Sequence, residues 1–212
     1  SAHMSVPLHW SGRATFRRIV PMTKLMNPPS SAHWSGADLA SEWVEAAVSA
    51  CREIEGDAAA HDRTGEFVHA GMAAMRDRGL TAMLVPAELG GGGATYAETA
   101  AALSLLARGC PATALTLSMH THLVAAQVWR HRHDLPAPVL ARVVNDRVVL
   151  VSTGAGDWVD SSGIAVKVDG GFRVSARKSP SSGAPAGDIL VSSAPWESPD
   201  GGQVIHFAVP FS

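Results

Sequence analysis

The sequence has few cysteines, little charge and no long apolar run. Its two cysteines, Cys51 and Cys110, lie in helix-like segments without Cys-x-x-Cys or Cys/His ligand spacing, which indicates buried thiols of a reducing compartment. No run of about 18 apolar residues occurs, so no membrane span is expected. The formal net charge of -2 gives no basic face of the kind that nucleic-acid binding requires. We therefore expect a cytoplasmic protein with no nucleic-acid partner.

Acidic residues are missing from the N-terminal segment. The first 37 residues contain neither Asp nor Glu but carry four basic residues, as a transit peptide does. Ser1–Met4 instead resembles a cloning remnant, and Met22 or Met26 could be the native start. We assign residues 1–36 to a flexible tag or leader. The excess of arginine over lysine, with abundant alanine, is typical of a GC-rich bacterial coding sequence.

Residues 37–147 carry the periodicity of helices. Apolar residues recur at helical spacing after the expected caps Asp38, Thr64 and Thr95, and Gly79 and Gly109 provide stop signals. Pro111 suits a helix first turn. The segment from Ala112 to His131 that follows is apolar on most sides, which predicts a buried helix. A short helix is expected over 139–145. These segments predict a helical N-terminal domain.

The hydrophobic period changes to that of strands at Val148. Ile164, Val166 and Val168 alternate with less apolar residues, and Gly170-Gly171 predicts a hairpin turn. Further strands are expected at 189–191 and 204–209. The predicted class is α+β: an N-terminal α-helical bundle over 37–147, followed over 148–212 by part of an antiparallel β-barrel or sandwich domain. The apolar content of 46% with only 17% charge suits large buried interfaces and a homo-oligomer.

Four segments carry a family resemblance in their order and spacing. They are VPAELGGGG at 85–93, SMHTHLV at 118–124, STGAGDWVDSSGI at 152–164 and RKSPSSGAPAGD at 177–188. Over residues 38–212 the chain resembles the acyl-CoA dehydrogenase superfamily, with its P-x-x-x-G-G loop, its T-E-P-x-x-G-S-D loop and its G-x-K…A-D strand and turn. The resemblance implies that the C-terminal helical domain is missing from this chain.

The resemblance implies FAD-dependent α,β-dehydrogenation of an acyl-CoA thioester. An electron-accepting flavoprotein or another acceptor would be the partner. No catalytic residue lies in this chain, because the family's proton-abstracting carboxylate belongs to the missing domain. A flavin needs backbone donors and small hydroxyls near its ring. The implied FAD contacts are Leu150, Val151, Ser152, Thr153, Pro180 and Ser182. The implied substrate contacts are His120, Trp158, Val159 and Asp160.

Departures from the family pattern leave two other functions open. The Glu and Pro of T-E-P are absent, Pro180 replaces the aromatic that covers the flavin, and the loop's Asp is matched only by Asp160 or Asp157. A flavin-dependent monooxygenase of the same fold would use reduced flavin and oxygen. A non-catalytic interaction module would need a partner that supplies the missing helices.

Three other patterns favour structural roles. His120 and His122, like His131 and His133, are two residues apart and so face different sides of a helix, which argues against a metal site. The glycines at 90–93 lack the Lys-Ser/Thr of a phosphate-binding loop and predict a flexible turn. No G-x-S-x-G motif accompanies Ser152, which argues against a hydrolase.

Overall fold

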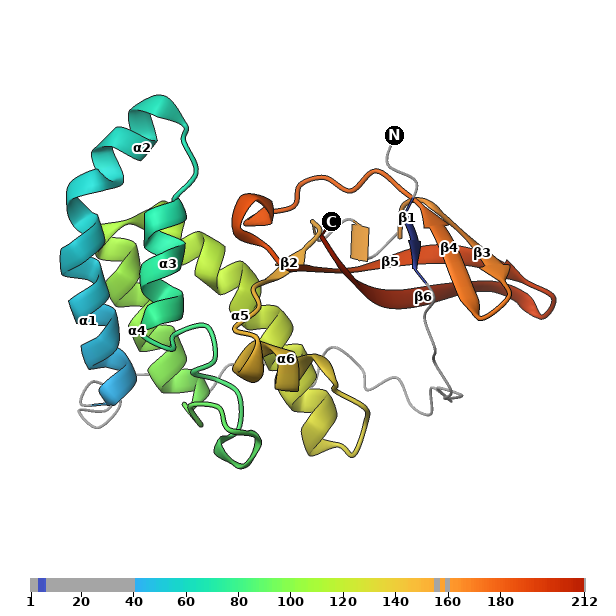
Figure 1. The fold of residues 1–212 in the computed structure, drawn as a ribbon, viewed down its shortest axis with the longest axis horizontal. Helices are drawn as coiled ribbons and strands as arrows, with labels where there is room; N and C mark the ends of the chain where they lie inside the picture. Colours follow the sequence, from blue (N-terminus) through green and yellow to red (C-terminus); the bar gives the residue numbers. More distant parts are fainter. Residues whose placement is uncertain (1–3, 7–40, 155–156, 159–160, 212) are drawn as a thin grey trace, which may run out of the picture.

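A helical half and a sheet half follow one another in the computed structural model, which describes residues 4–6, 41–154, 157–158 and 161–211 (Figure 1). The helices are α1 Glu42–Ile54, α2 Ala58–Thr64, α3 His69–Asp77, α4 Tyr96–Gly109, α5 Pro111–Arg132 and α6 Val139–Asn145, with short 3-10 turns η2 Glu55–Asp57, η3 Ala87–Leu89 and η4 Ala184–Ala186. The strands are β1 Met4–Val6, β2 Leu150–Ser152, β3 Ile164–Val168, β4 Gly171–Ser175, β5 Ile189–Ser198 and β6 Gly201–Pro210. This order confirms the predicted α+β class.

Local signals explain most helix boundaries. As predicted, Thr95 precedes the first residue of α4 and Pro111 is the first residue of α5; Thr95 also forms a capping box with Glu98. Ser41 caps α1 by accepting from the Val44 amide at 3.3 Å, whereas the predicted cap Asp38 lies outside the described residues. The prediction that Thr64 begins a helix is wrong. Thr64 ends α2, because Gly65 takes the left-handed conformation and α3 starts only at His69.

Two small sheets form the second half. One has the strand order β1-β4-β3 and is antiparallel, and the other has the order β2-β5-β6. β5 and β6 form a long antiparallel hairpin, but β2 pairs with β5 in parallel, with Leu150 opposite Ile189. The expectation of a purely antiparallel domain is therefore wrong for this pair. Parallel neighbours need a long crossover connection, and here the segment between β2 and β5, which includes the β3–β4 hairpin, provides it.

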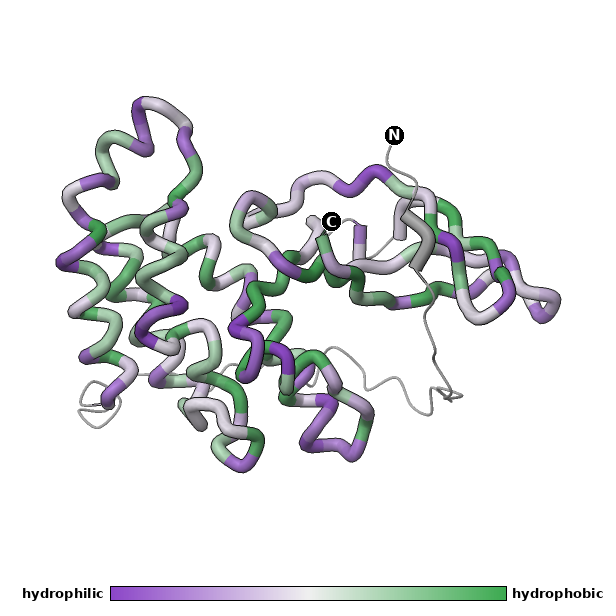
Figure 2. Tube along the Cα trace, in the orientation of Figure 1, coloured by the Kyte–Doolittle hydropathy of each residue, from purple (hydrophilic) through white to green (hydrophobic). Residues whose placement is uncertain are grey.

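The two halves meet where α5 packs against β2. A shared apolar cluster joins the ends of both halves, and Figure 2 shows apolar residues concentrated along β2 and its surroundings. Its buried members are Leu84, Val85, Leu123, Val124, Val128, Leu140, Val143, Val148, Leu150, Ile189 and Val191. Such a continuous core fixes β2 relative to the helices.

Of the predicted leader, Met4–Val6 forms β1 and pairs with β4, and the rest lies outside the described residues. Among the described helices, none is long and apolar enough to cross a membrane.

The loop at 85–93 is tightly bonded rather than a loose turn. The amide of Gly93 donates to the Val85 carbonyl at 2.8 Å, and the amide of Ala94 donates to the Met83 carbonyl at 2.8 Å. A Cβ on Gly91 would clash with the Val85 carbonyl oxygen, which is a backbone atom and cannot move aside. Glycine is therefore required at this position by close approach.

Gly91→Ala is expected to lower the free energy of unfolding by about 1–3 kcal/mol, because the added methyl group overpacks the loop. The matched control is Gly56→Ala, where no atom lies within 4 Å of the added Cβ. The control is expected to leave stability unchanged or to raise it by about 0.4–1 kcal/mol. Urea unfolding of both variants measures the difference, and equal midpoints would contradict this account of the loop.

Candidate functional site

The structure brings the end of β2 against the segment that follows Lys178. The amide of Gly154 donates to the Pro180 carbonyl at 3.1 Å, and a Cβ on Gly154 would lie 2.8 Å from the Pro180 ring. Three residues after Pro180, Gly183 takes φ +86° and lies against Thr116 of α5. Two of the segments that the sequence singled out therefore form one surface at the tip of β2 (Ser152–Gly154), beside α5.

The hydroxyls at the tip of β2 are buried and differ in their bonding. Thr153 Oγ1 donates to Asp157 Oδ2 at 2.6 Å and lies 3.2 Å from Ser192 Oγ. Ser152 Oγ is buried with no hydrogen-bond partner, one of three such side-chain atoms in the part of the chain that the structure describes. Buried polar atoms are nearly always bonded, so this hydroxyl is an unused donor at the strand end.

A buried ion pair closes the loop that follows β2. Lys178 Nζ lies 2.7 and 2.9 Å from the two carboxylate oxygens of Asp157, and the two side chains are only 7% and 6% exposed. Lys178 also donates to the carbonyls of Ser162 and Ser193, both at 2.7 Å. All three donors of the ammonium group are used, and the loop is tied to β5.

Asp157 is a structural anion rather than a proton acceptor. Burial alone would raise its pKa, but hydrogen bonds from Lys178, Ser162 and Thr153 outweigh burial and hold the pKa well below its usual range. Both carboxylate oxygens are occupied, since the Ser162 amide donates to Oδ1 at 3.0 Å and Ser192 Oγ donates to Oδ2 at 3.1 Å. A carboxylate held in this way cannot remove a substrate proton near neutral pH.

His120 has no exposed surface, and both of its ring nitrogens contact backbone. Nε2 lies 2.8 Å from the Thr81 carbonyl, and Nδ1 lies 2.9 Å from the Leu150 amide. Burial lowers its pKa to about 4, so the ring is neutral near pH 7. A direct contact of His120 with substrate remains a prediction from the resemblance, and the ring offers a ligand no free nitrogen in this arrangement.

The other predicted contacts are spread over the same region. Leu150 and Val151 are buried in the core, Pro180 is exposed and Ser182 is half-buried. Trp158 is half-buried and stacks on His206 with ring centroids 5.4 Å apart. Val159 and Asp160 lie outside the described residues. Among the described residues, no group of three or more His, Cys, Asp or Glu side chains could hold a metal ion.

The start of the sheet half is joined to α3 by an ion pair that the sequence did not predict. Arg76 donates to Asp188 Oδ2 at 2.6 Å and to the Ala186 carbonyl at 2.8 Å. The same Asp188 oxygen accepts from the Val149 amide at 2.7 Å. Asp188 ends the 177–188 motif, so its place in that motif was the available signal, but nothing in the sequence pointed to Arg76.

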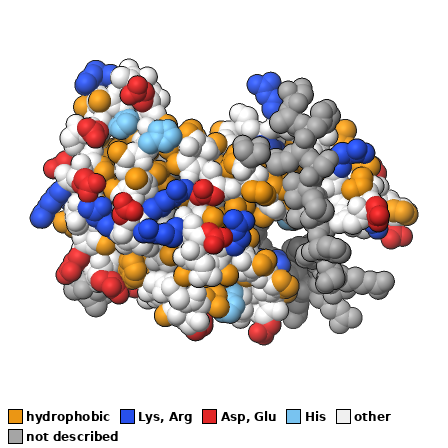
Figure 3. Space-filling view, viewed as in Figure 1, with side chains coloured by type: hydrophobic (Ala, Val, Ile, Leu, Met, Phe, Trp, Pro, Cys, Tyr) orange, Lys and Arg blue, Asp and Glu red, His pale blue; other side chains and the backbone are white. Residues whose placement is uncertain are grey.

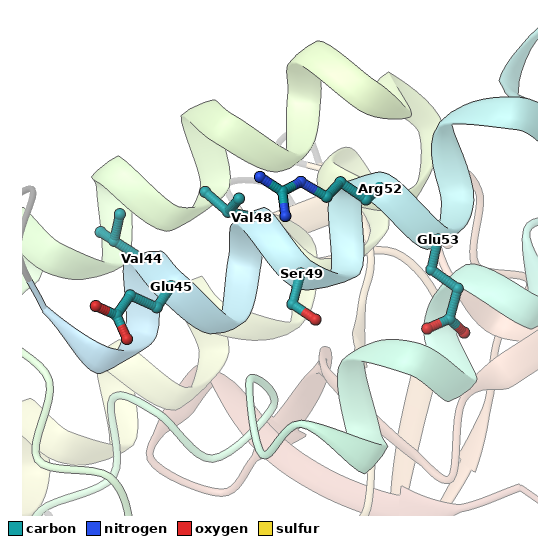
Figure 4. Close-up of a pocket in the computed structure, with 6 residues that line it drawn as sticks. All are labelled: Val44, Glu45, Val48, Ser49, Arg52 and Glu53. Carbon is teal, nitrogen blue, oxygen red and sulfur yellow. The ribbon is translucent and has the colours of Figure 1, made fainter.

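Two surface hollows lie away from the tip of β2. One lies along α1 and is formed by the six side chains drawn in Figure 4, with Val44 and Val48 beside Glu45 and Arg52. The other lies between α3 and the start of β5, next to Arg76 and Asp188. Acidic and basic side chains are interspersed over the helical half (Figure 3), and neither hollow contains a predicted site residue.

Comparison with known proteins agrees with the architecture. Residues 42–134 match the family described as acyl-CoA dehydrogenase, N-terminal domain. The putative acyl-CoA dehydrogenase YdbM of Bacillus subtilis is 30% identical over 151 residues, which cover 66% of this chain and 39% of that protein. The chain thus spans well under half the length of this relative.

Two solved structures are similar over most of the chain. Methanesulfinate monooxygenase MsuC from Pseudomonas fluorescens is 26% identical, with a TM-score of 0.68. The matched region covers 80% of this chain and 43% of the MsuC chain. KijD3 in complex with FMN and a dTDP-linked amino-keto sugar is 29% identical with a TM-score of 0.69, covering 84% of this chain and 46% of its own.

Proposed function

Because residues 42–134 match the N-terminal domain of the acyl-CoA dehydrogenase family, we propose that the chain forms one side of the flavin site of a flavin-dependent oxidoreductase. The observation that carries this proposal is the tip of β2. There the Ser152 hydroxyl has no partner, and Gly154 keeps the neighbouring backbone free of side-chain bulk. Small groups of this kind suit the edge of a flavin ring.

The residues at this tip fit a flavin and would hold it in distinct ways. The Ser152 hydroxyl is free to donate, whereas the Thr153 hydroxyl already donates its hydrogen bond to Asp157 and can only accept another. Pro180 and Ser182 lie on the facing segment, so they would cover one edge of the ring. The ion pair between Asp157 and Lys178 links the two segments. When bound, the flavin supplies the hydride acceptance that no side chain provides.

The reaction proposed for the whole enzyme is α,β-dehydrogenation of an acyl-CoA thioester with FAD. It is supported by the 30% identity to the putative acyl-CoA dehydrogenase of Bacillus subtilis. The proton-abstracting base would lie outside the described residues, since the carboxylate nearest the tip, Asp157, is fully hydrogen-bonded. Electrons would pass to a flavoprotein or another acceptor, and the enzyme would be a homo-oligomer in the cytoplasm.

A second candidate reaction is monooxygenation with reduced flavin and oxygen. It is supported by the 26% identity to the methanesulfinate monooxygenase. The 29% identity to KijD3, whose structure contains FMN, supports FMN as the flavin. The absence of Glu and Pro after Thr153 also favours monooxygenation, because those residues belong to the dehydrogenase loop pattern. Under this proposal the flavin would be FMN rather than FAD.

Gly154→Ala is expected to weaken flavin binding by about tenfold or more, because the new methyl group pushes Pro180 away from the tip. The matched control in the same half is Gly202→Ala, where the nearest atom to the added Cβ is 3.8 Å away. Titration of the chain with FAD and with FMN, followed by flavin fluorescence, gives both affinities. Equal flavin affinity in the two variants would contradict the proposed site.

The two reactions are distinguished with the full-length enzyme. Under dehydrogenation, acyl-CoA thioesters bleach the oxidised flavin without oxygen. Under monooxygenation, the oxidised flavin is unchanged by thioesters, and oxygen is consumed only after the flavin has been reduced. If a flavin-loaded protein shows neither behaviour, the non-catalytic module is the better description.

A further inference from the structure

His120 connects three elements that are far apart in the sequence. It lies on α5, and its ring contacts the Thr81 carbonyl in the loop after α3 and the Leu150 amide at the start of β2. The distances of 2.8 and 2.9 Å are those of good hydrogen bonds. The ring has no exposed surface, so these bonds are shielded from water.

The two contacts determine which ring nitrogen carries the proton. A carbonyl oxygen only accepts, so Nε2 must donate to Thr81. A backbone amide only donates, so Nδ1 must accept from Leu150. His120 is therefore the neutral tautomer protonated at Nε2. A doubly protonated ring has two donors and would lose the contact with Leu150.

β2 depends on side chains to hold its start. The strand has three residues and pairs with β5 along one edge, and among the described strands none pairs with its other edge. At that start, His120 accepts from the Leu150 amide and Asp188 accepts from the Val149 amide. A strand this short contributes few ladder bonds of its own, so these side-chain bonds act together with the apolar core in setting its position against α5.

We propose that His120 is a positioning residue for the flavin site: by accepting from the Leu150 amide, it fixes β2 and thereby the tip at Ser152–Gly154. The inference rests on the proposed function, because the tip is the proposed flavin contact. Leu150, Val151 and Ser152 are consecutive in one strand, so a displacement at Leu150 moves the Ser152 hydroxyl with it. In this role His120 acts from within the core, since its ring has no exposed surface and both ring nitrogens are bonded to backbone.

Two substitutions separate the two bonds of the ring. Asparagine at position 120 places an amide oxygen near the Nδ1 position and can still accept from Leu150. Glutamine places an amide nitrogen near the Nε2 position and keeps only the bond to Thr81. His120→Asn is expected to retain flavin affinity within about threefold, and His120→Gln to lose about tenfold, since one buried hydrogen bond to β2 is lost.

Hydrogen exchange of the Leu150 amide reports on the same bond without flavin. It is expected to stay slow in His120→Asn and to become fast in His120→Gln. The pair His122→Asn and His122→Gln serves as the control, because His122 lies on the exposed side of the same helix and should change neither quantity. Equal exchange rates and equal flavin affinities in the two His120 variants would overturn the proposal.

The unmodified chain provides a test that does not depend on the variants folding. Nitrogen-15 NMR of the His120 ring is expected to show the tautomer protonated at Nε2. A ring protonated at Nδ1, or at both nitrogens near pH 7, would overturn the assignment of Nδ1 as acceptor. If the unmodified chain binds no flavin, the proposed function fails, while the tautomer and the Leu150 exchange still decide whether His120 holds β2.

Discussion

Lys178→Met is expected to lower the free energy of unfolding by about 3–5 kcal/mol, among the largest effects of any single substitution in this chain. The substitution leaves the Asp157 carboxylate buried at 6% exposure without its cation. It also leaves the Ser162 and Ser193 carbonyls without their shared donor. Breaking one side of a buried ion pair is costly because the remaining charge has lost its solvation. Urea unfolding at pH 7 measures the change.

Two controls identify the buried charge as the cause. Lys167→Met removes an exposed lysine of β3 that lies 5.8 Å from the Trp196 ring centre, and it should cost less than about 1 kcal/mol. In the double variant Asp157→Asn with Lys178→Met, no unpaired charge remains, so part of the loss should be recovered. A double variant less stable than Lys178→Met alone would contradict the role of the unpaired carboxylate.

Acid is expected to destabilise the fold well before its carboxylates are protonated. The pKa of His120 is lowered from 6.5 to about 4, so the unfolded chain takes up a proton at that position while the folded chain does not. Stability is therefore lost as the pH falls from about 6.5 to about 4, by roughly 3 kcal/mol when each pKa unit counts for about 1.4 kcal/mol.

The surroundings of His120 support this sign. Burial lowers the pKa most, and the positive charges of Arg76 and His122 lower it further. The Thr81 carbonyl and the Asp188 carboxylate raise it without reversing the effect. Partial burial also lowers the pKa of His122 and of His206, so both add to the loss in the same direction.

The Asp157 carboxylate acts in a separate pH range. Its folded pKa is lowered, so its contribution is present above the usual carboxyl pKa and is lost only as the pH falls below about 4.

Urea midpoints measured between pH 7 and 4 should fall steeply for the unmodified chain and much less for His120→Asn. The same slope in both would contradict the assignment of this pH dependence to His120.

Local signals made the helical half predictable. Thr95 and Pro111 have direct chemical reasons to begin helices, and the apolar segment after Pro111 is the long helix α5. Thr64 was misleading because threonine suits a helix start in general, whereas here its hydroxyl bonds back to the Ala60 carbonyl inside α2. The left-handed Gly65 that follows was the better signal.

The sequence singled out the two segments that form the candidate site, but not the bonds between them. The motifs around Thr153 and Pro180 indicated that two distant loops matter, and the structure joins them through Gly154. The Asp157–Lys178 pair spans two such loops and follows no periodic pattern, so spacing could not have revealed it. The parallel pairing of β2 with β5 escaped prediction for the same reason, since it depends on how the chain returns after the β3–β4 hairpin.

The most direct test of the account is to titrate the isotopically labelled chain with FAD and with FMN while recording backbone amide shifts. The account predicts saturable binding of one flavin, with the largest shifts at Ser152, Thr153 and Gly154 and on the facing segment at Ser181 and Ser182. Saturable binding with the largest shifts elsewhere, for example around α1, or no binding by a folded chain, would contradict the claim that the tip of β2 forms one side of a flavin site.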